Sequence, residues 1–407
     1  MKRLCIFGLF FSSLTLQAQE TPKATPLVVD ASKHPSLQAA FDAVPLTGGV
    51  VLIPPGDYPI EAPLRVSTGE TRIVGSGAAT HIINKNAGGE PALILEPPTL
   101  AKDPKARLWR VQIADLRISG NEKSGDGVFA HGIQEIYLEG VSIDHHGANG
   151  VHMVDCFEDP RVADCIFTYN KAVGVKIVNC HDIVVNANHF EENQDALVCT
   201  DSFNLCMNGN NIDDHLRHGV VIENTYGSVL SGNMIEECNG TAIILDRDCY
   251  GITLSANVIA HHLEGGIDLR DAWGCSISAN TFTIAHKFSI RVAKDSGRLT
   301  LSANNFCNTY IGGADKRPSE APTPMGIDEG TGILLEETRD VSISGNTFGG
   351  LSTPAVWTAG ACERILISGN IATDCRRKGT RTGSYFELGE SRKSVKKDNI
   401  SSGELVE

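Results

Sequence analysis

The chain has 407 residues, of which 41% are hydrophobic and 21% are charged, and its formal net charge at pH 7 is −14. This acidic balance argues against nucleic acid as a partner, because contacts to phosphate groups need a basic surface. The twelve cysteines show no paired C-x-x-C spacing, which argues against the common zinc-binding patterns.

The first residues have the pattern of a secretory signal peptide. A basic start, Met1-Lys2-Arg3, leads into the apolar stretch 4–16 and then into Gln17-Ala18-Gln19. The apolar stretch is too short to span a bilayer, and no later segment is long and apolar enough to do so. We therefore expect residues 1–18 to be removed and the mature protein to be secreted or periplasmic, with no membrane span.

The first part of the mature chain predicts a short helix. The stretch "SLQAAFDAVP" (36–45) has amphipathic spacing, and "GGVVLIPPGDYPIEAPLRV" (48–66) and "TRIVGSGAATHII" (71–83) follow it. A helix in this place would cap the open end of a stack of strands, as solenoids require.

One repeat accounts for most of the chain. Its marker is a small residue, then Asn, then any residue, then Ile or Phe, and most markers are 22 to 24 residues apart. One step of 42 residues is read as a unit that carries an insertion, at about 307–332. The markers are Asn188, Asn210, Asn233, Asn257, Asn280, Asn304, Asn346 and Asn370, and Asp164 takes the same place one unit earlier.

Each unit has a second landmark before the Asn, a short stretch of alternating apolar residues such as "GVKIV" (174–178) or "GVVIE" (219–223). Such a unit cannot bury its apolar face alone, whereas stacked units bury it jointly. The repeat therefore predicts an all-β, single-stranded parallel β-helix over residues 27–375. The Asn column is expected to be a structural ladder, and residues 376–407 are expected to be a charged tail without the repeat.

A column of small residues precedes the markers by eight positions. Cys156 and Cys180 lie in this column, one coil apart, where neighbouring backbones are about 4.8 Å from each other. This spacing allows a disulfide, and it is equally typical of stacked buried thiols.

The opening stretches and the coils together resemble the pectate-lyase-like superfamily, which includes pectate lyases, polygalacturonases, rhamnogalacturonases and phage tailspike enzymes. The resemblance covers roughly residues 27–375. It implies a right-handed parallel β-helix, and it leaves the reaction open, because one fold hosts many chemistries.

The stretch "GGIDLRDAWGCSISANTF" (265–282) puts both signs of charge on the outer face of an apolar strand. Read coil by coil, the second and fourth strand positions place five charged residues on one outer face over four consecutive coils: Glu223, Asp246, Asp268, Arg270 and Arg291. Histidines crowd the loops that enter these strands, in "DHH" (144–146), "DDHLRH" (213–218) and "HH" (261–262). We therefore expect a functional site on this face.

The spacing of the carboxylates is compatible with glycosidase chemistry. Glu223 and Asp246 would be about 5 Å apart, and Asp246 and Asp268 about 8 Å apart. The first distance is near that of retaining glycosidases and the second lies in the inverting range, so both outcomes stay open.

"QDALVCTDS" (194–202) followed by "RHGVVIE" (217–223) resembles the polygalacturonase pattern, in which an Asp pair opens one strand and Gly-His-Gly opens the next. Asp195 and His218 are the matching positions. Gln194, Val173 and Arg217 depart from the family pattern, so two of its three carboxylates are missing.

These observations favour a secreted enzyme that cleaves glycosidic bonds in a polysaccharide and needs no cofactor. Acid–base roles fall to Asp246 with Glu223 or Asp268, assisted by Asp195 and His218. The substrate-binding residues are expected to be Arg270, Arg291, Lys176 and His152.

Two other functional hypotheses stay open. A polysaccharide lyase would act on a uronate polymer by β-elimination, with Ca²⁺ held by Glu223, Asp246 and Asp268. An epimerase or a transglycosidase on the same fold is a further alternative. A carbohydrate-binding or adhesive solenoid would have no activity, although three Trp residues offer few platforms for sugar stacking. The sequence does not indicate the polysaccharide or the oligomeric state.

Overall fold

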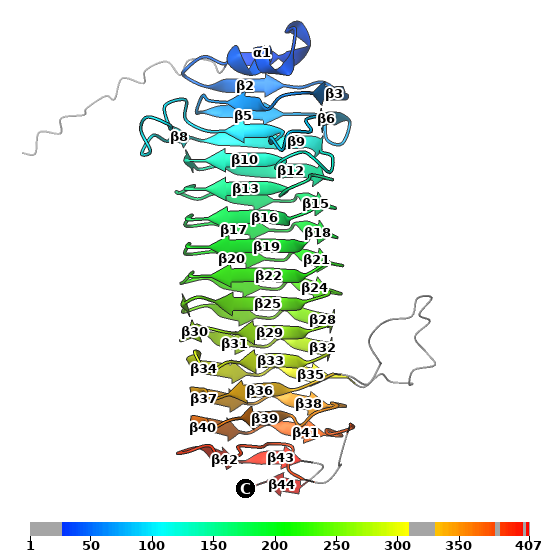
Figure 1. The fold of residues 1–407 in the computed structure, drawn as a ribbon, viewed down its shortest axis with the longest axis vertical. Helices are drawn as coiled ribbons and strands as arrows, with labels where there is room; N and C mark the ends of the chain where they lie inside the picture. Colours follow the sequence, from blue (N-terminus) through cyan, green and yellow to red (C-terminus); the bar gives the residue numbers. More distant parts are fainter. Residues whose placement is uncertain (1–26, 309–329, 379–382, 402–403, 407) are drawn as a thin grey trace, which may run out of the picture.

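The computed structural model describes residues 27–308, 330–378, 383–401 and 404–406. The chain forms a right-handed parallel β-helix, a column of stacked coils with a short helix at its N-terminal end (Figure 1). The predicted fold class is confirmed. The expected signal peptide and most of the expected insertion lie outside the described residues.

The helix α1 (Leu37–Asp42) covers the first coils as predicted. Ser36 caps it by accepting a hydrogen bond from the N–H of Ala39, and Leu37, Ala40 and Phe41 are buried against the core. A short 3₁₀ turn, η1 (Ala31–Lys33), precedes it. None of the described residues forms a helix long and apolar enough to cross a membrane.

One face of the column is a twelve-stranded parallel sheet, to which most coils contribute one strand. We call it the twelve-stranded sheet. Its strands are β4 (Leu64–Val66), β7 (Leu93–Leu95), β10 (Val128–His131), β13 (Val151–Val154), β16 (Val173–Val178), β19 (Asp195–Thr200), β22 (His218–Glu223), β25 (Thr241–Asp246), β29 (Gly265–Leu269), β33 (Phe288–Val292), β36 (Ile333–Glu336) and β39 (Val356–Ala359).

The other two faces form one continuous sheet, because the long strands β9 (Val111–Ser119) and β12 (Tyr137–Asp144) bend around the corner between them. The strands before the corner are β1 (Leu27–Asp30), β2 (Gly49–Leu52), β5 (Thr71–Val74), β14 (Arg161–Ala163), β17 (Val184–Asn186), β20 (Cys206–Asn208), β23 (Val229–Ser231), β27 (Thr253–Ser255), β31 (Ser276–Ser278), β34 (Gly297–Ser302), β37 (Arg339–Ser344), β40 (Glu363–Ser368) and β42 (Val395–Lys397).

The strands after the corner are β3 (Gly56–Ile60), β6 (Thr80–Asn84), β15 (Ile166–Thr168), β18 (His189–Glu191), β21 (Asn211–Asp213), β24 (Met234–Glu236), β28 (Val258–His262), β32 (Thr281–Ala285), β35 (Asn305–Cys307), β38 (Thr347–Gly349), β41 (Ile371–Thr373) and β43 (Asn399–Ser401). Short strands at other turns are β8 (Leu108–Trp109), β11 (Ile133–Gln134), β26 (Cys249–Tyr250), β30 (Ala272–Trp273) and β44 (Glu404–Val406).

The predicted Asn ladder lies at this corner and is buried. Asn257 shows the pattern: its N–H and its Nδ2 both donate to Oδ1 of Asn280, and its Nδ2 also donates to the carbonyl of Leu230. The left-handed residue is the one before each Asn, for example Ala256 with φ 55°. Each coil is therefore tied to the next by side-chain as well as backbone hydrogen bonds.

The ladder corrects one position of the predicted register. Oδ1 of Asn188 accepts a hydrogen bond from the N–H of Cys165, and Ile166 pairs with His189. Cys165 rather than Asp164 therefore takes the ladder position. Asp164 has φ 54° and is the left-handed residue of that coil.

The predicted column of small residues is buried at another corner. The N–H of Cys156 donates to Sγ of Cys180 at 3.4 Å, and the N–H of Cys180 donates to Ser202. All eleven cysteines among the described residues are free thiols. Of the two alternatives for Cys156 and Cys180, stacked buried thiols are therefore confirmed, and the disulfide is not formed.

The solenoid continues past the predicted boundary at residue 375. β42 pairs with β40, β43 pairs with β41, and Asn399 accepts hydrogen bonds from the N–H and Nδ2 of Asn370. The segment predicted to be a tail without the repeat thus contributes a further coil and extends the ladder by one Asn.

Candidate functional site

The charged residues predicted for the outer face of the twelve-stranded sheet are in the predicted register. Glu223 on β22 pairs with Asp246 on β25, and Asp268 on β29 pairs with Arg291 on β33. The sequence spacing alone therefore placed these side chains on neighbouring coils.

An alternating chain of ion pairs links these side chains. Arg270 lies 3.6 Å from Asp246 through Nη1 and donates to Asp268 through Nε at 2.8 Å. Arg291 donates to Asp268 at 3.1 Å and to Glu336 at 2.7 Å. Acidic and basic groups thus alternate along the solenoid axis from β25 to β36.

Exposure separates the carboxylates into two groups. The Asp268 side chain is 4% exposed because Arg270 and Arg291 cover it, so the expectation that it faces solvent is wrong. The side chains of Asp246 and Glu223 are 30% and 31% exposed. A substrate on this face can therefore reach Glu223 and Asp246 but not Asp268.

A depression of about 690 Å³ adjoins this chain of ion pairs. Asp246, Arg270, Arg291 and Glu336 are among the residues that line it. Glu336 is a site residue that the sequence reasoning missed. It occupies the fourth strand position after the glycine of the landmark "GILLE" (332–336), so following the column one coil further, across the insertion, would have found it.

Asp195 and His218, the positions that resemble the polygalacturonase motif, are adjacent but not equally accessible. Asp195 is fully buried and binds the guanidinium of Arg217 and the backbone N–H of His218. We therefore read Asp195 as the group that fixes this turn rather than as one that reaches a substrate.

His218 is held in one tautomer. Its Nδ1 accepts a hydrogen bond from the N–H of Thr241 at 3.0 Å, so a neutral ring carries its proton on Nε2. Burial lowers the pKa of His218, although the negative charge of Asp195 acts to raise it. A Cβ at Gly240 would overlap the His218 ring, so glycine is required there. His218 can therefore offer an N–H donor toward a ligand at neutral pH.

Lys176 and His152 do not join the other predicted binding residues. They are paired on β16 and β13, and His152 lies 3.2 Å from Asp126. Four ladder steps separate Lys176 from Asp268, about 19 Å at 4.8 Å per step. These two residues could contact only a distant unit of a long polymer.

Three of the histidines in these loops are structural, so the prediction that they mark a functional site is wrong for them. His146, His215 and His262 are fully buried. Burial lowers the pKa of His146 and His215 to about 4 and that of His262 to about 3, so these rings are neutral at pH 7.

A second charged feature escaped the sequence reasoning. Pairs of acidic residues end three successive strands, β18, β21 and β24, and form what we call the acidic edge: Glu191, Glu192, Asp213, Asp214, Glu236 and Glu237. Burial, and then neighbouring carboxylates, raise the pKa of Asp213 and of Glu237. The sequence does contain a sign of this edge, since a pair of adjacent acidic residues recurs once per coil over three coils.

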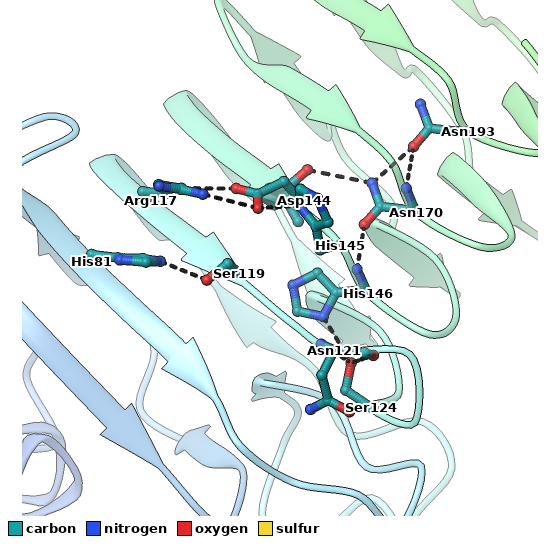
Figure 2. A network of polar contacts seen from close by, with 11 residues as sticks. His81, Arg117, Ser119, Asn121, Ser124, Asp144, His145, His146, Asn170 and Asn193 are labelled. Carbon is teal, nitrogen blue, oxygen red and sulfur yellow. Dashed lines mark hydrogen bonds and ion pairs between the residues drawn. The ribbon is translucent and has the colours of Figure 1, made fainter.

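A third polar feature lies near the N-terminal end, where Figure 2 shows neighbouring groups of polar contacts. Arg117 forms two hydrogen bonds with Asp144, which also binds Nδ1 of His145 at 2.7 Å. Next to them, His81 contacts the hydroxyl of Ser119. Although burial opposes it, Arg117 and His145 hold the pKa of Asp144 below its usual value.

Comparison with known proteins supports the fold and the compartment. The family model described as periplasmic copper-binding protein (NosD) matches residues 161–316, which is less than half of the chain. A comparison with curated protein sequences gave no match. The family description supports the predicted periplasmic or secreted location.

Solved structures show the same fold, a parallel β-helix. Gene product 12 of bacteriophage phi29 has a TM-score of 0.70 at 10% identity, covering 92% of this chain and 57% of the phage protein. The A-module of the Azotobacter vinelandii mannuronan C-5 epimerase AlgE6 has a TM-score of 0.53 at 15% identity, covering 91% of this chain and 98% of that module. A mutant of the periplasmic alginate epimerase AlgG has a TM-score of 0.52 at 13% identity, covering 91% of this chain and 83% of the epimerase. At these identities the likeness shows the fold alone.

The copper named by the family model can be tested against the side chains. Among the described residues, two groups bring three His, Cys, Asp or Glu ligand atoms within 4.8 Å of one another: Glu236, Glu237 and His261, and Asp213, Asp214 and Glu237. One imidazole among carboxylates suits hard cations, whereas copper prefers imidazole and sulfur ligands. These residues therefore do not fit a copper site.

Proposed function

We propose that this protein cleaves glycosidic bonds of a polysaccharide on the outer face of the twelve-stranded sheet. The observation that carries the proposal is that Glu223 and Asp246 lie side by side in the ladder and are both accessible to solvent. Adjacent strands are about 4.8 Å apart, close to the spacing of about 5–5.5 Å between the carboxyl groups of retaining glycosidases.

The surrounding groups support the binding of a sugar chain. Arg247 contacts Glu223 at 3.1 Å, and its backbone N–H donates to Asp246 at 2.8 Å, so both carboxylates are fixed in place. Arg270 and Arg291 line the adjoining depression and are 40% and 30% exposed, which leaves guanidinium surface for acidic or hydroxylated sugar units.

The general class of the proposal is supported by the likeness to carbohydrate-active β-helix proteins, among them the two epimerases. The names of these two epimerases refer to mannuronan and alginate, and this chain's own residues specify neither polymer. The proposed substrate is accordingly a polysaccharide with acidic or hydroxylated units, bound along the sheet.

β-Elimination on a uronate polymer is the second proposal, favoured by the cluster of arginines that could neutralise a sugar carboxylate. Ca²⁺ bound by Glu223, Asp246 and Asp268 would have to displace Arg247, Arg270 and Arg291 from these carboxylates. A lyase would generate a C=C bond that absorbs in the ultraviolet, and a Ca²⁺-dependent lyase would lose activity with a chelator.

The test uses Asp246→Asn and Glu223→Gln, which keep the shape of each side chain and remove its charge. Each should lower the release of reducing ends by at least ~100-fold, because an acid–base group is lost. Asp340→Asn is the matched control, since Asp340 is 31% exposed and paired with Arg364 on another face. If both site variants keep wild-type activity on a polymer that the wild type cleaves, the proposal is wrong.

A further inference from the structure

We propose that Ser119 is the nucleophile of a separate hydrolytic site, which cleaves short-chain acyl esters with His81 as its base and Asp57 as the residue that orients His81. The site lies near the N-terminal end, away from the twelve-stranded sheet, and it does not depend on the function proposed above.

The three side chains are arranged in the order that such a mechanism needs. Nε2 of His81 lies 2.5 Å from Oγ of Ser119, and Nδ1 of the same ring lies 3.3 Å from Oδ1 of Asp57. Figure 2 shows the His81 ring directed at Ser119. A hydroxyl on one ring nitrogen and a carboxylate on the other define the nucleophile, base and orienting group of a serine hydrolase.

The ladder of strands creates this arrangement from distant parts of the chain. Asp57 on β3 pairs with His81 on β6, and His81 pairs with Arg117 on β9. Ser119 follows Arg117 by two residues on the same strand, so both side chains point to the same face. The three groups are thus set on strands, which hold a site more precisely than loops do.

The position of the hydroxyl restricts the substrate. Ser119 is 8% exposed and belongs to the lining of a depression of about 480 Å³, together with Arg117, Asn121, Tyr169 and Lys171. A small acyl group can reach a recessed hydroxyl of this kind, whereas the polar rim suits a hydroxyl-rich alcohol portion. We therefore expect acetyl esters of sugar hydroxyls to be the natural class of substrate.

The reaction balances with water as the second substrate. Oγ of Ser119 attacks the ester carbonyl carbon while its proton passes to Nε2 of His81, and Asp57 stabilises the charged ring. The C–O bond to the alcohol breaks as His81 returns the proton to the leaving oxygen. Water, deprotonated by His81, then attacks the acyl-Ser119 ester, releases the carboxylic acid and restores the hydroxyl.

Arg117 is placed to stabilise the negative oxygen of the tetrahedral intermediate. It lines the same depression as Ser119, and its Nε and Nη2 are the atoms that bind Asp144. Its Nη1 takes no part in those two bonds and can donate to an oxyanion. Asp144 in turn fixes the guanidinium on this face.

The experiment measures hydrolysis of p-nitrophenyl acetate and labelling by a fluorophosphonate probe, with the modified residue located by mass spectrometry. We expect the probe to modify Ser119, and Ser119→Ala and His81→Gln to lower the rate by at least ~100-fold with unchanged melting temperatures. Ser278→Ala, a half-buried serine on β31, is the control and should keep the wild-type rate.

Labelling of the wild type needs no variant, so the test holds even if a substitution impairs folding. Absence of label on Ser119, or wild-type hydrolysis by folded Ser119→Ala, would overturn the proposal. Because the assay contains no polysaccharide, either outcome is independent of the proposed polymer cleavage.

Discussion

Replacing Asn257 by alanine should destabilise the solenoid by about 2–4 kcal/mol. Oδ1 of Asn257 accepts the N–H and the Nδ2 of Asn233 at 3.0 and 2.9 Å, and its Nδ2 donates to Asn280 and Leu230 at 2.9 and 3.1 Å. In the variant, the buried N–H of Asn233 loses this acceptor, at a cost of about 1–3 kcal/mol, and the other lost bonds add about 1 kcal/mol.

The assay is urea unfolding combined with hydrogen exchange of the Asn233 amide, which reports the local opening of this coil. Asn211→Ala is the matched control, because Asn211 is exposed, stands beside a ladder Asn and bonds His189 at the surface. The control should change the free energy of unfolding by less than about 0.5 kcal/mol. Wild-type stability and wild-type protection of Asn233 in Asn257→Ala would refute the reasoning.

Three further predictions concern stability. The free energy of unfolding, measured with urea, should be lower at pH 5 than at pH 7. The expected decrease is about 2 kcal/mol for each of His146, His215 and His262. The sign follows because the rings stay neutral when folded, with pKa values of about 4, 4 and 3, but bind protons below pH 6.5 when unfolded; a flat profile would contradict it. Asp214→Asn should raise the melting temperature slightly at pH 7 and less at low pH. Burial is the main cause of the raised pKa of Asp213 and of Glu237, and the charge of Asp214 raises both further. A lowered melting temperature at pH 7 would count against this repulsion. Deleting the complete coil 234–257 should leave a shorter folded solenoid by circular dichroism, whereas deleting half of it should abolish folding; equal behaviour would show that the register is wrong.

The sequence predicted the register of the site because side chains alternate along a strand and the coil length is nearly constant. Those two regularities place Glu223 beside Asp246 without any knowledge of the rest of the molecule. They say nothing about rotamers. Arg270 and Arg291 turn toward the same carboxylate and cover Asp268, and Arg217 does the same to Asp195.

Other parts of the molecule were missed because the repeat marker is irregular there. His81 and Ser119 precede the first marker, so no periodicity relates them, and 38 residues separate them along the chain. Asn399 follows Asn370 by 29 residues and is preceded by Asp398, which takes a left-handed conformation with φ 56° where most coils have Gly or Ala. Because the marker requires a small residue before its Asn, it does not recognise the last coil.

The most direct test of the proposed function is a screen of polysaccharides for products, with the wild type, Asp246→Asn and Asp340→Asn compared on each polymer. We predict that the wild type and Asp340→Asn release reducing ends without ultraviolet absorbance from a C=C bond, and that Asp246→Asn does not. Product absorbance would show elimination instead of hydrolysis. Binding without any depolymerisation by the wild type would contradict an enzymatic role for this face.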